Sequence, residues 1–184
     1  IAFEVIFVDD DSPDGTAELA KEIARQRPDV RCIHRVGRRG LSSACIEGMA
    51  ASAAEFVAVI DADLQHDETI LPALLERVEQ GADIAVGSRY SGTGNSEQGL
   101  SAGRQAGSHF ATRLSGILTG KALTDPMSGY FALTREAFDS AVRDLSGQGY
   151  KILLDICASS AAPLRMAEVP YQFRAREAGD SKLD

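Results

Sequence analysis

Short apolar runs alternate along the chain with segments in which apolar residues recur at helical spacing. Residues 3–8 form a compact run rich in Val, Ile and Phe that leads into the turn-forming sequence 9–15, which predicts a buried strand followed by a loop. Asp14 or Thr16 is a suitable cap for the helix expected next, which Pro28 ends. The same rhythm predicts strands at 30–36, 55–60, 83–87, 130–134 and 165–174, and helices at 41–53, 68–80, 104–118, 135–143 and 151–160.

This order of strand, loop and helix is typical of an α/β domain with a mostly parallel sheet flanked by helices. Residues 90–103 are rich in Gly, Ser, Thr and Asn and show no periodicity, which predicts a mobile loop of the kind that covers an active site. The polar tail 177–184 is expected to be loose. No repeat or convincing linker divides the sequence, so we interpret residues 1–184 as a single domain.

Composition narrows the classes of function. The chain has 184 residues, of which 44% are apolar, and this is enough for a substantial core. Its formal net charge of −8 would repel a nucleic-acid backbone, so no nucleic-acid partner is expected. The apolar runs are far shorter than the ~20 residues of a membrane-spanning helix. Three cysteines without C-x-x-C spacing argue against a disulfide framework and a zinc site, and they favour a reducing, cytoplasmic compartment.

Two acidic clusters each follow an apolar strand directly. Asp9, Asp10 and Asp11 come after the first predicted strand, and Asp61 and Asp63 come after the third. The carboxyl ends of strands in an open α/β sheet form the ligand crevice, so we expect both clusters to face one cleft. Carboxylates gathered there favour a hard divalent ion, Mg²⁺ or Mn²⁺, that shares its ligand shell with substrate phosphates. The alternative is that these residues only cap helices and form turns.

Several other motifs can be compared with these clusters. The first strand is followed by aspartates, where a dinucleotide-binding fingerprint needs glycines, and the sequence contains no P-loop. Neither cluster has the glycine that a calcium-binding EF-hand loop needs at its sixth position. An aspartyl-phosphate phosphohydrolase also places two aspartates one residue apart after a strand, and it would use Asp61 as the nucleophile. It stays as an alternative, although Gln65 stands where such enzymes usually have Thr or Val.

Basic residues lie at places suited to phosphate binding. Arg89 ends the fourth predicted strand, Arg104 opens the helix after the long loop, and Arg176 and Lys182 are in the tail. The planar fork of arginine matches phosphate oxygens well, and the amino ends of helices favour anions. The alternative for each arginine is a surface ion pair. The three histidines are widely spaced and are weak candidates for a ligand or a base.

Taken together, six short motifs resemble the polyprenol-phosphate (dolichol-phosphate) mannosyltransferases of glycosyltransferase family 2. They run in the order of that family along the whole chain. The motifs are VDDDSPDGT at 8–16, RGLSSA at 39–44, DADLQH at 61–66, GSRY at 87–90, DPMSGY at 125–130, and Arg176 with Gly179, Ser181 and Lys182.

The resemblance implies a GT-A fold, in which a nucleotide sugar binds across a parallel-rich sheet and a divalent metal sits on the D-x-D element. It implies that Asp9 and Asp10 lie at the nucleoside. It also implies that Asp61, Ala62 and Asp63 form the D-x-D element that binds the nucleotide sugar. Asp61, Asp63 and Gln65 would bind Mg²⁺ or Mn²⁺ together with the donor diphosphate.

The same resemblance assigns the acceptor side of the site. The residues implied for the phosphate of the lipid acceptor are Arg89, Arg104 and Ser108, and those implied to close over the diphosphate are Arg176 and Lys182. Asp125 would lie near the reaction centre, with its role open between positioning and catalysis. Asp63, Arg89 and Asp125 are therefore the expected catalytic set.

The activity implied is an inverting transfer of mannose from GDP-mannose to a polyprenyl phosphate, giving a β-linked product. Such an enzyme would be peripheral at the cytoplasmic face of a membrane, held by an amphipathic surface or by a membrane-anchoring partner protein. One alternative is a UDP-sugar donor with undecaprenyl phosphate. The family's first strand and Pro-x-Tyr-Asn-Glu element are not present in this chain, so we expect the domain to lack its first strand, and a non-catalytic nucleotide-binding remnant is another alternative.

Overall fold

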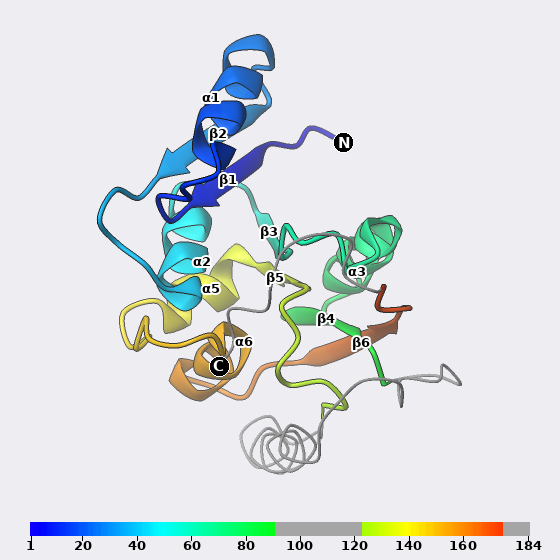
Figure 1. Ribbon diagram of the computed structural model, residues 1–184. Coiled ribbons are helices and arrows are strands. Elements are labelled where there is room, and N and C mark those ends of the chain that lie inside the picture. The colour runs from blue at the N-terminus through cyan, green and yellow to red at the C-terminus, as the bar shows by residue number, and fades with distance from the viewer. Residues whose placement is uncertain (91–122, 175–184) are drawn as a thin grey trace. The chain divides into compact units, whose positions relative to one another are not determined.

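A computed structural model describes residues 1–90 and 123–174 (Figure 1). These residues form two compact units, one made of Ile1–Ala53 and Ser146–Ile152 and the other of the rest of the described chain. Most of the predicted loop 90–103, the predicted helix 104–118 and the tail 177–184 lie outside the described residues.

The first unit is built on two parallel strands. Strand β1 (Val5–Asp9) pairs with β2 (Val30–His34), in a register that runs from Val5 opposite Val30 to Asp9 opposite His34. The helices are α1 (Thr16–Gln26) and α2 (Leu41–Ala50), and α1 connects the two strands as the crossover that a parallel pair requires. The buried apolar side chains of this unit are mostly small: Ala17, Ala20, Val30, Ala44, Met49 and Ile152.

The start of α1 differs from the prediction. Gly15 is the N-cap residue, with a φ of 85°, a left-handed conformation that glycine adopts without the steric cost borne by other residues. Neither Asp14 nor Thr16 is the cap; instead, Asp14 Oδ1 accepts hydrogen bonds from the backbone N–H and the hydroxyl of Thr16, at 3.1 and 2.7 Å. The left-handed turn reverses the chain after β1, so that the helix can return along the strand pair.

The second unit holds a four-stranded sheet in the order β3-β5-β4-β6. Its strands are β3 (Phe56–Val59), β4 (Ile84–Ser88), β5 (Phe131–Thr134) and β6 (Met166–Pro170). Strand β5 is antiparallel to both β3 and β4, whereas β4 and β6 are parallel. Three of the four strands therefore run in one direction, and β5 is the exception to the parallel arrangement expected from the sequence.

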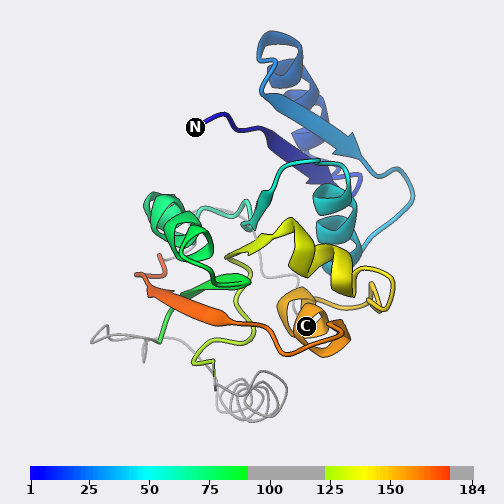
Figure 2. The ribbon, with the colours of Figure 1, turned by 180° about the vertical axis from the view of Figure 1, so that it is seen from behind.

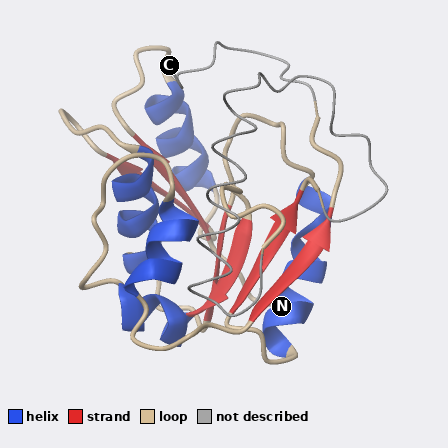
Figure 3. Ribbon diagram, turned by 90° about the horizontal axis from the view of Figure 1, so that it is seen from below, coloured by secondary structure: helices blue, strands red, loops and turns tan. Residues whose placement is uncertain are grey.

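Helices cover both faces of this sheet (Figures 2 and 3). Helix α3 (Leu71–Glu79) follows the short 3-10 helix η1 (Glu68–Ile70), while α5 (Arg135–Ala141) and α6 (Ile152–Ser159) lie on the opposite side. Under α3 the core is formed by Leu74, Val78, Ala85, Tyr130, Ala132 and Val169. Every residue of β4 is buried, as expected for a strand covered on both faces.

Most element boundaries in this unit lie within one or two residues of the predicted ones, and two places differ more. The helix expected at 68–80 opens as η1, where Asp67 Oδ1 accepts a hydrogen bond from Thr69 N, before α3 begins with Pro72 in its first turn. The strand expected at 165–174 ends at Pro170. Beyond it the chain is still held, since Arg174 N donates to Gln65 O at 2.8 Å. No helix in the described part of the chain has both the length and the apolar composition needed to span a membrane.

Candidate active site

Asp61 and Asp63 lie in the turn that follows β3, in the second unit. Asp63 Oδ1 accepts a hydrogen bond from Gln65 N at 3.1 Å, and Leu64 between them has a φ of 62°. The left-handed residue bends the chain sharply, and the Asp63 carboxylate closes the bend. The apolar strand thus ends in a tight turn that carries both carboxylates.

The carboxylate of Asp61 fills the space beside Gly129. A Cβ atom built on Gly129 would overlap Asp61 Oδ2 and would lie 2.9 Å from Asp61 Cγ. A residue with a Cβ could stand here only if the Asp61 side chain moved, because only the hydrogen of glycine leaves room for the carboxylate where it lies. Gly129 belongs to the DPMSGY motif and Asp61 to the DADLQH motif, so the fold brings two of the predicted motifs into direct contact.

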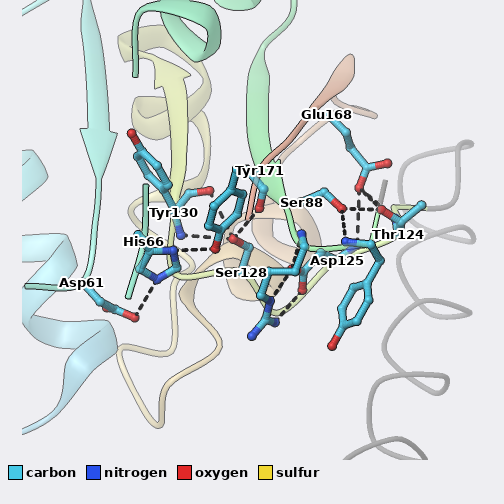
Figure 4. Close-up of polar contacts among 12 residues, drawn as sticks. Asp61, His66, Ser88, Thr124, Asp125, Ser128, Tyr130, Glu168 and Tyr171 are labelled. Atoms are coloured by element: carbon cyan, nitrogen blue, oxygen red, sulfur yellow. Dashed lines mark hydrogen bonds and ion pairs between the residues drawn. The ribbon is translucent and has the colours of Figure 1, made fainter. Parts of the chain in front are cut away.

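His66 lies between Asp61 and Tyr171 (Figure 4). It is 5% exposed, with its Nδ1 2.6 Å from the hydroxyl of Tyr171 and its Nε2 3.5 Å from Asp61 Oδ2. Burial raises the pKa of Tyr171, so its hydroxyl keeps its proton and can donate it to Nδ1. The N–H of the imidazole then faces the carboxylate of Asp61. The rings of Tyr130 and Phe173 pack against His66 with their edges and fix its orientation.

Arg89 and Asp125 form a two-pronged ion pair at the end of β4. Arg89 Nε and Nη2 donate to the two oxygens of Asp125 at 2.7 and 2.8 Å, and the backbone N–H of Arg89 donates to the same carboxylate at 3.3 Å. Asp125 is 1% exposed. Burial alone would disfavour the charge on Arg89, but the hydrogen bonds and the charge of Asp125 outweigh it and raise the pKa of Arg89. The guanidinium is therefore permanently charged and rigidly held.

One side of the Arg89 fork faces away from Asp125. Within residues 1–90 and 123–174, no hydrogen bond engages Nη1, so this group can donate to a second anion. The guanidinium carbon also lies 5.5 Å from the centre of the Tyr90 ring and 5.3 Å from that of Phe173. An arginine fixed by a buried carboxylate and stacked on aromatic rings is well suited to binding a phosphate.

Gln65 and Arg174 connect the turn after β3 to the segment after β6. Besides the backbone bond from Arg174, Gln65 Nε2 donates to Arg174 O at 3.2 Å. The Arg174 guanidinium contacts Asp67 and Glu68 at 3.0 and 2.8 Å. With its nitrogen committed to Arg174, the amide of Gln65 is oriented by a second group, as the side chains of metal ligands often are.

The carboxylates of the first unit are held by hydrogen bonds within that unit. Asp9 Oδ1 accepts from Ser12 N at 2.9 Å, and Asp10 accepts from Gly40 N and from Arg35 Nη1, both at 2.7 Å. Arg35 is 2% exposed and also donates to Ser43 Oγ at 2.6 Å. Asp10 is thus fixed at the end of β1 by a buried arginine and a backbone N–H.

Asp11 takes a different role from its two neighbours. Its φ of 64° is left-handed, and its Oδ1 lies 2.8 Å from His34 Nε2. His34 Nδ1 lies 2.7 Å from Lys21 Nζ, which can only donate. Asp11 therefore closes the loop after β1 onto β2 and α1.

The structure brings together Asp61, Gly129, His66 and Tyr171 in one cluster and Arg89 with Asp125 in another, all in the second unit. Asp9 and Asp10 belong to the first unit. The common cleft for both acidic clusters therefore stays a prediction. The other predicted site residues, Arg104, Ser108, Arg176 and Lys182, lie outside the described residues.

The donor set after β3 fits a hard divalent cation. Asp61 and Asp63 offer carboxylate oxygens in one turn, Ala62 between them adds no bulk, and Gln65 can offer an amide oxygen. No group of three or more His, Cys, Asp or Glu side chains is arranged to hold a metal in the parts of the chain that the structure describes. Two carboxylates that leave further positions for substrate phosphates are typical of magnesium sites.

Sequence reasoning did not single out three residues that make contacts around these clusters: Arg35, His66 and Glu168. His66 was a weak candidate, although it directly follows Gln65 in a turn that opens with two carboxylates. Glu168 and Arg35 gave no motif of their own. The available signal for Glu168 was a charged residue inside the otherwise apolar run MAEVP, where it is half-buried and makes hydrogen bonds to a neighbouring segment.

Solved structures show the same fold. Glucosyl-3-phosphoglycerate synthase from Mycobacterium tuberculosis, in complex with Mn²⁺, UDP-glucose and phosphoglyceric acid, superposes with a TM-score of 0.61 at 21% identity and covers 95% of this chain and 61% of that one. The same enzyme with Mg²⁺ and UDP gives a TM-score of 0.60 at 21% identity, covering 95% and 60%. These similarities confirm the GT-A fold expected from the sequence.

Sequence relatives cover nearly the whole chain. The dolichol-phosphate mannosyltransferase of Pyrococcus furiosus is 39% identical over 183 residues, which is 98% of this chain and 51% of that protein. The enzyme of the same name from Mycosarcoma maydis is 36% identical over 98% of this chain and 61% of its own length. The polyprenol monophosphomannose synthase of Mycolicibacterium smegmatis is 35% identical, covering 97% and 69%.

The chain thus spans between half and about two thirds of the length of these relatives. Residues 1–141 match the family described as Glycosyl transferase family 2, a range that contains both acidic clusters and the Arg89–Asp125 pair. By this match and by its relatives, the chain belongs to glycosyl transferase family 2.

Proposed function

We propose that this protein transfers a mannosyl group from a nucleotide sugar, GDP-mannose, to a polyprenyl phosphate. The observation that carries the proposal is the Arg89–Asp125 pair, which holds a charged fork whose Nη1 has no hydrogen bond within residues 1–90 and 123–174, in the same unit as the D-x-D turn. The names of the three relatives, all mannosyltransferases or mannose synthases acting with dolichol or polyprenol phosphate, supply the substrate classes.

The donor would be bound through its diphosphate and its nucleoside. In this proposal Asp61, Asp63 and Gln65 hold Mg²⁺ or Mn²⁺, which when bound would neutralise the charge of the departing nucleoside diphosphate. Asp9 and Asp10 are assigned to the nucleoside. Because Asp10 already accepts two hydrogen bonds within the protein, its carboxylate would meet the donor in a fixed orientation. Arg176 and Lys182 are assigned to the diphosphate on the resemblance alone.

The acceptor phosphate would bind at Arg89, together with Arg104 and Ser108. Since both oxygens of Asp125 accept hydrogen bonds from Arg89, we assign Asp125 to positioning this arginine rather than to removing a proton. The acceptor is already a phosphate anion, so its attack on the anomeric carbon needs no strong general base. Direct displacement of the nucleoside diphosphate would invert the configuration of the sugar. The protein would act at the cytoplasmic face of a membrane, where a partner protein could anchor it.

Binding calorimetry tests the donor site. GDP-mannose and UDP-glucose are titrated into the wild type and into Asp63→Ala, each with and without Mn²⁺. We expect GDP-mannose to bind in the presence of Mn²⁺ and the substitution to weaken binding about 100-fold, since one of two carboxylate ligands is lost. A preference for UDP-glucose would keep the site and replace the donor. If neither nucleotide sugar binds, the transferase proposal is wrong.

A transfer assay then tests the acceptor. The wild type is incubated with radiolabelled GDP-mannose, Mn²⁺ and either dolichyl phosphate or undecaprenyl phosphate in detergent, and the lipid product is extracted. We expect a mannosyl lipid whose formation requires Arg89. Metal-dependent donor binding without transfer to any polyprenyl phosphate would support a nucleotide-binding remnant, and a phosphorylated Asp61 would support a phosphohydrolase.

A further inference from the structure

The carboxylate of Glu168 binds the segment that carries Asp125. Glu168 lies in β6, and its Oε1 accepts hydrogen bonds from Thr124 N and Thr124 Oγ1, both at 2.8 Å, and from Asp125 N at 3.3 Å (Figure 4). Three donors on one carboxylate oxygen use most of what that atom can accept. The backbone immediately before the buried Asp125 is thus held by a charge on a neighbouring strand.

A second line of hydrogen bonds leads from Glu168 to the segment that carries Arg89. The Thr124 hydroxyl donates its only proton to Glu168, so the Ser88 hydroxyl, 2.6 Å from Thr124 Oγ1, must donate to it. Ser88 Oγ in turn accepts from Tyr90 N at 3.2 Å. The donor directions therefore run one way, from Tyr90 through Ser88 and Thr124 to Glu168, and bonds ordered in this way strengthen one another.

Both ends of the ion pair are flanked by this network. Ser88 and Tyr90 are the chain neighbours of Arg89, and Thr124 is the neighbour of Asp125. Ser88 and Asp125 are each only 1% exposed, so the network joins two residues that are anchored in the protein interior, while Thr124 between them is exposed. The two segments come from places in the sequence 36 residues apart; Thr124 and Asp125 donate to Glu168 Oε1 directly, and Ser88 is linked to it through the Thr124 hydroxyl.

We propose that Glu168 is a positioning residue for acceptor binding, which fixes Arg89 and Asp125 through Thr124 and Ser88 without touching the substrate. The inference rests on the proposed function, in which Arg89 binds the acceptor phosphate. Glu168 acts through hydrogen-bond acceptance, so Glu168→Gln, whose side chain keeps an acceptor oxygen at the same place, preserves most of the effect and Glu168→Ala abolishes it.

The first measurement follows Arg89 itself, with no substrate present. The exchange of the Arg89 Nε–H with solvent is measured by NMR in the full-length wild type, in Glu168→Ala and in Glu168→Gln. We expect exchange to be faster by about tenfold in Glu168→Ala and close to wild type in Glu168→Gln, because a loosened ion pair opens more often. Exchange unchanged in Glu168→Ala overturns the positioning role, whether or not the protein proves to be a mannosyltransferase.

The second measurement separates acceptor from donor kinetics. In Glu168→Ala the KM for polyprenyl phosphate should rise about tenfold or more while the KM for GDP-mannose stays within about twofold of wild type, because only the acceptor arginine is disturbed. Thr124→Val should also raise the KM for polyprenyl phosphate, since it removes the hydroxyl that links Ser88 to Glu168. Glu79→Ala, which removes an exposed carboxylate of α3, is the matched control.

The outcomes distinguish the two proposals. If the wild type transfers no sugar, the proposed function fails and the exchange experiment alone decides the role of Glu168. If the wild type is active and both KM values rise equally in Glu168→Ala, with loss of thermal stability, the role of Glu168 is general support of the fold and the inference is wrong.

Discussion

Arg89 and Asp125 depend on each other for their placement in the protein interior. Asp125 is 1% exposed, and the side chain of Arg89 is 23% exposed. Removing either partner leaves the other charge poorly compensated, whereas removing both leaves no unpaired charge. In the first unit Arg35 is the more deeply buried partner of Asp10, but it also lies 3.2 Å from Glu47, so its charge keeps a second partner.

This pairing predicts a non-additive effect on stability. Arg89→Ala, which leaves Asp125 buried without its partner, should lower the free energy of unfolding by about 3 kcal/mol, and Asp125→Ala should do likewise. The double variant should lose clearly less than the sum, because the interaction is then lost only once. Urea unfolding of the four proteins followed by circular dichroism gives these values. Strict additivity would show that the two side chains do not interact in solution.

Gly129 allows a second test at a single position. Gly129→Ala should push the Asp61 carboxylate out of place and weaken Mn²⁺-dependent binding of GDP-mannose about tenfold or more, since misplaced groups around a metal site typically cost that much affinity. Calorimetry measures the affinity, and thermal unfolding measures the cost of the clash.

The matched control for Gly129→Ala removes the atoms that the new methyl group would meet. In Asp61→Ala with Gly129→Ala the carboxylate is gone, so the double variant should unfold at a higher temperature than Gly129→Ala alone. If Gly129→Ala binds the donor as well as the wild type does, the contact with Asp61 has no bearing on the site.

Candidate site residues can be identified from the sequence where they stand in a recognisable local context. Asp61, Asp63 and Arg89 each directly follow an apolar strand, and that position alone marks them. His66, Arg35 and Glu168 act through partners that are distant in sequence: Tyr171, Asp10 and Thr124. Such contacts depend on how strands and loops are brought together, which the local pattern does not contain.

At the level of elements, the hydrophobic pattern placed every strand of the described residues correctly and erred at the ends. Strand β6 is shorter than its apolar pattern because its partner β4 ends at Ser88, which pairs with Pro170, the last residue of β6. The reversed direction of β5 was not predictable, since the residues of an antiparallel strand buried on both faces read like those of a parallel one. Strand β5 nonetheless determines the site, because Gly129 and Tyr130 directly precede it.

The pairing of β4 with β6 is reinforced at its start by Asp83 and Arg165, which directly precede the two strands. Asp83 accepts hydrogen bonds from Arg165 N, Nε and Nη2 at 2.7, 3.0 and 2.7 Å. The hydrogen bonds from the Arg165 side chain, which outweigh the cost of burial, lower the pKa of Asp83 from its ordinary value of 3.8. The folded protein therefore binds a proton at Asp83 less readily than the unfolded chain does.

This lowered pKa predicts how the stability contributed by Asp83 depends on pH. The contribution is fully present above the ordinary value of 3.8 and is lost as the pH falls through the folded value, because the unfolded chain takes up the proton first. At pH 7 the wild type should exceed Asp83→Asn by about 1 kcal/mol, a modest amount because Arg165 is largely exposed. The difference should disappear near pH 2, as urea unfolding at a series of pH values would show. A difference that grows on acidification would contradict this prediction, and Glu79→Gln on α3 serves as the control.

At the scale of the whole molecule, the negative net charge of the protein opposes its binding to an anionic membrane. The net charge of −8 repels an anionic lipid surface, although the proposed acceptor is itself an anionic lipid. If the proposed function holds, the attraction of these residues to such a membrane would come from local recognition of the acceptor phosphate, with Arg89 as the described residue best arranged for it. A protein that relied on diffuse attraction would need the opposite sign of charge.

This opposition predicts selective binding to vesicles. The protein should sediment with phosphatidylcholine vesicles that contain polyprenyl phosphate. It should not sediment with phosphatidylcholine vesicles in which phosphatidylserine supplies the same amount of negative charge. Arg89→Ala should weaken the first interaction about tenfold, because a hydrogen-bonded charge pair with the phosphate is lost. Raising the salt concentration should have little effect on binding to polyprenyl phosphate, since a net repulsion is screened at the same time as the local attraction. Equal binding to both kinds of vesicle would mean that a surface outside the described site attaches the protein to membranes, and the local recognition of phosphate would then have to be abandoned as the explanation.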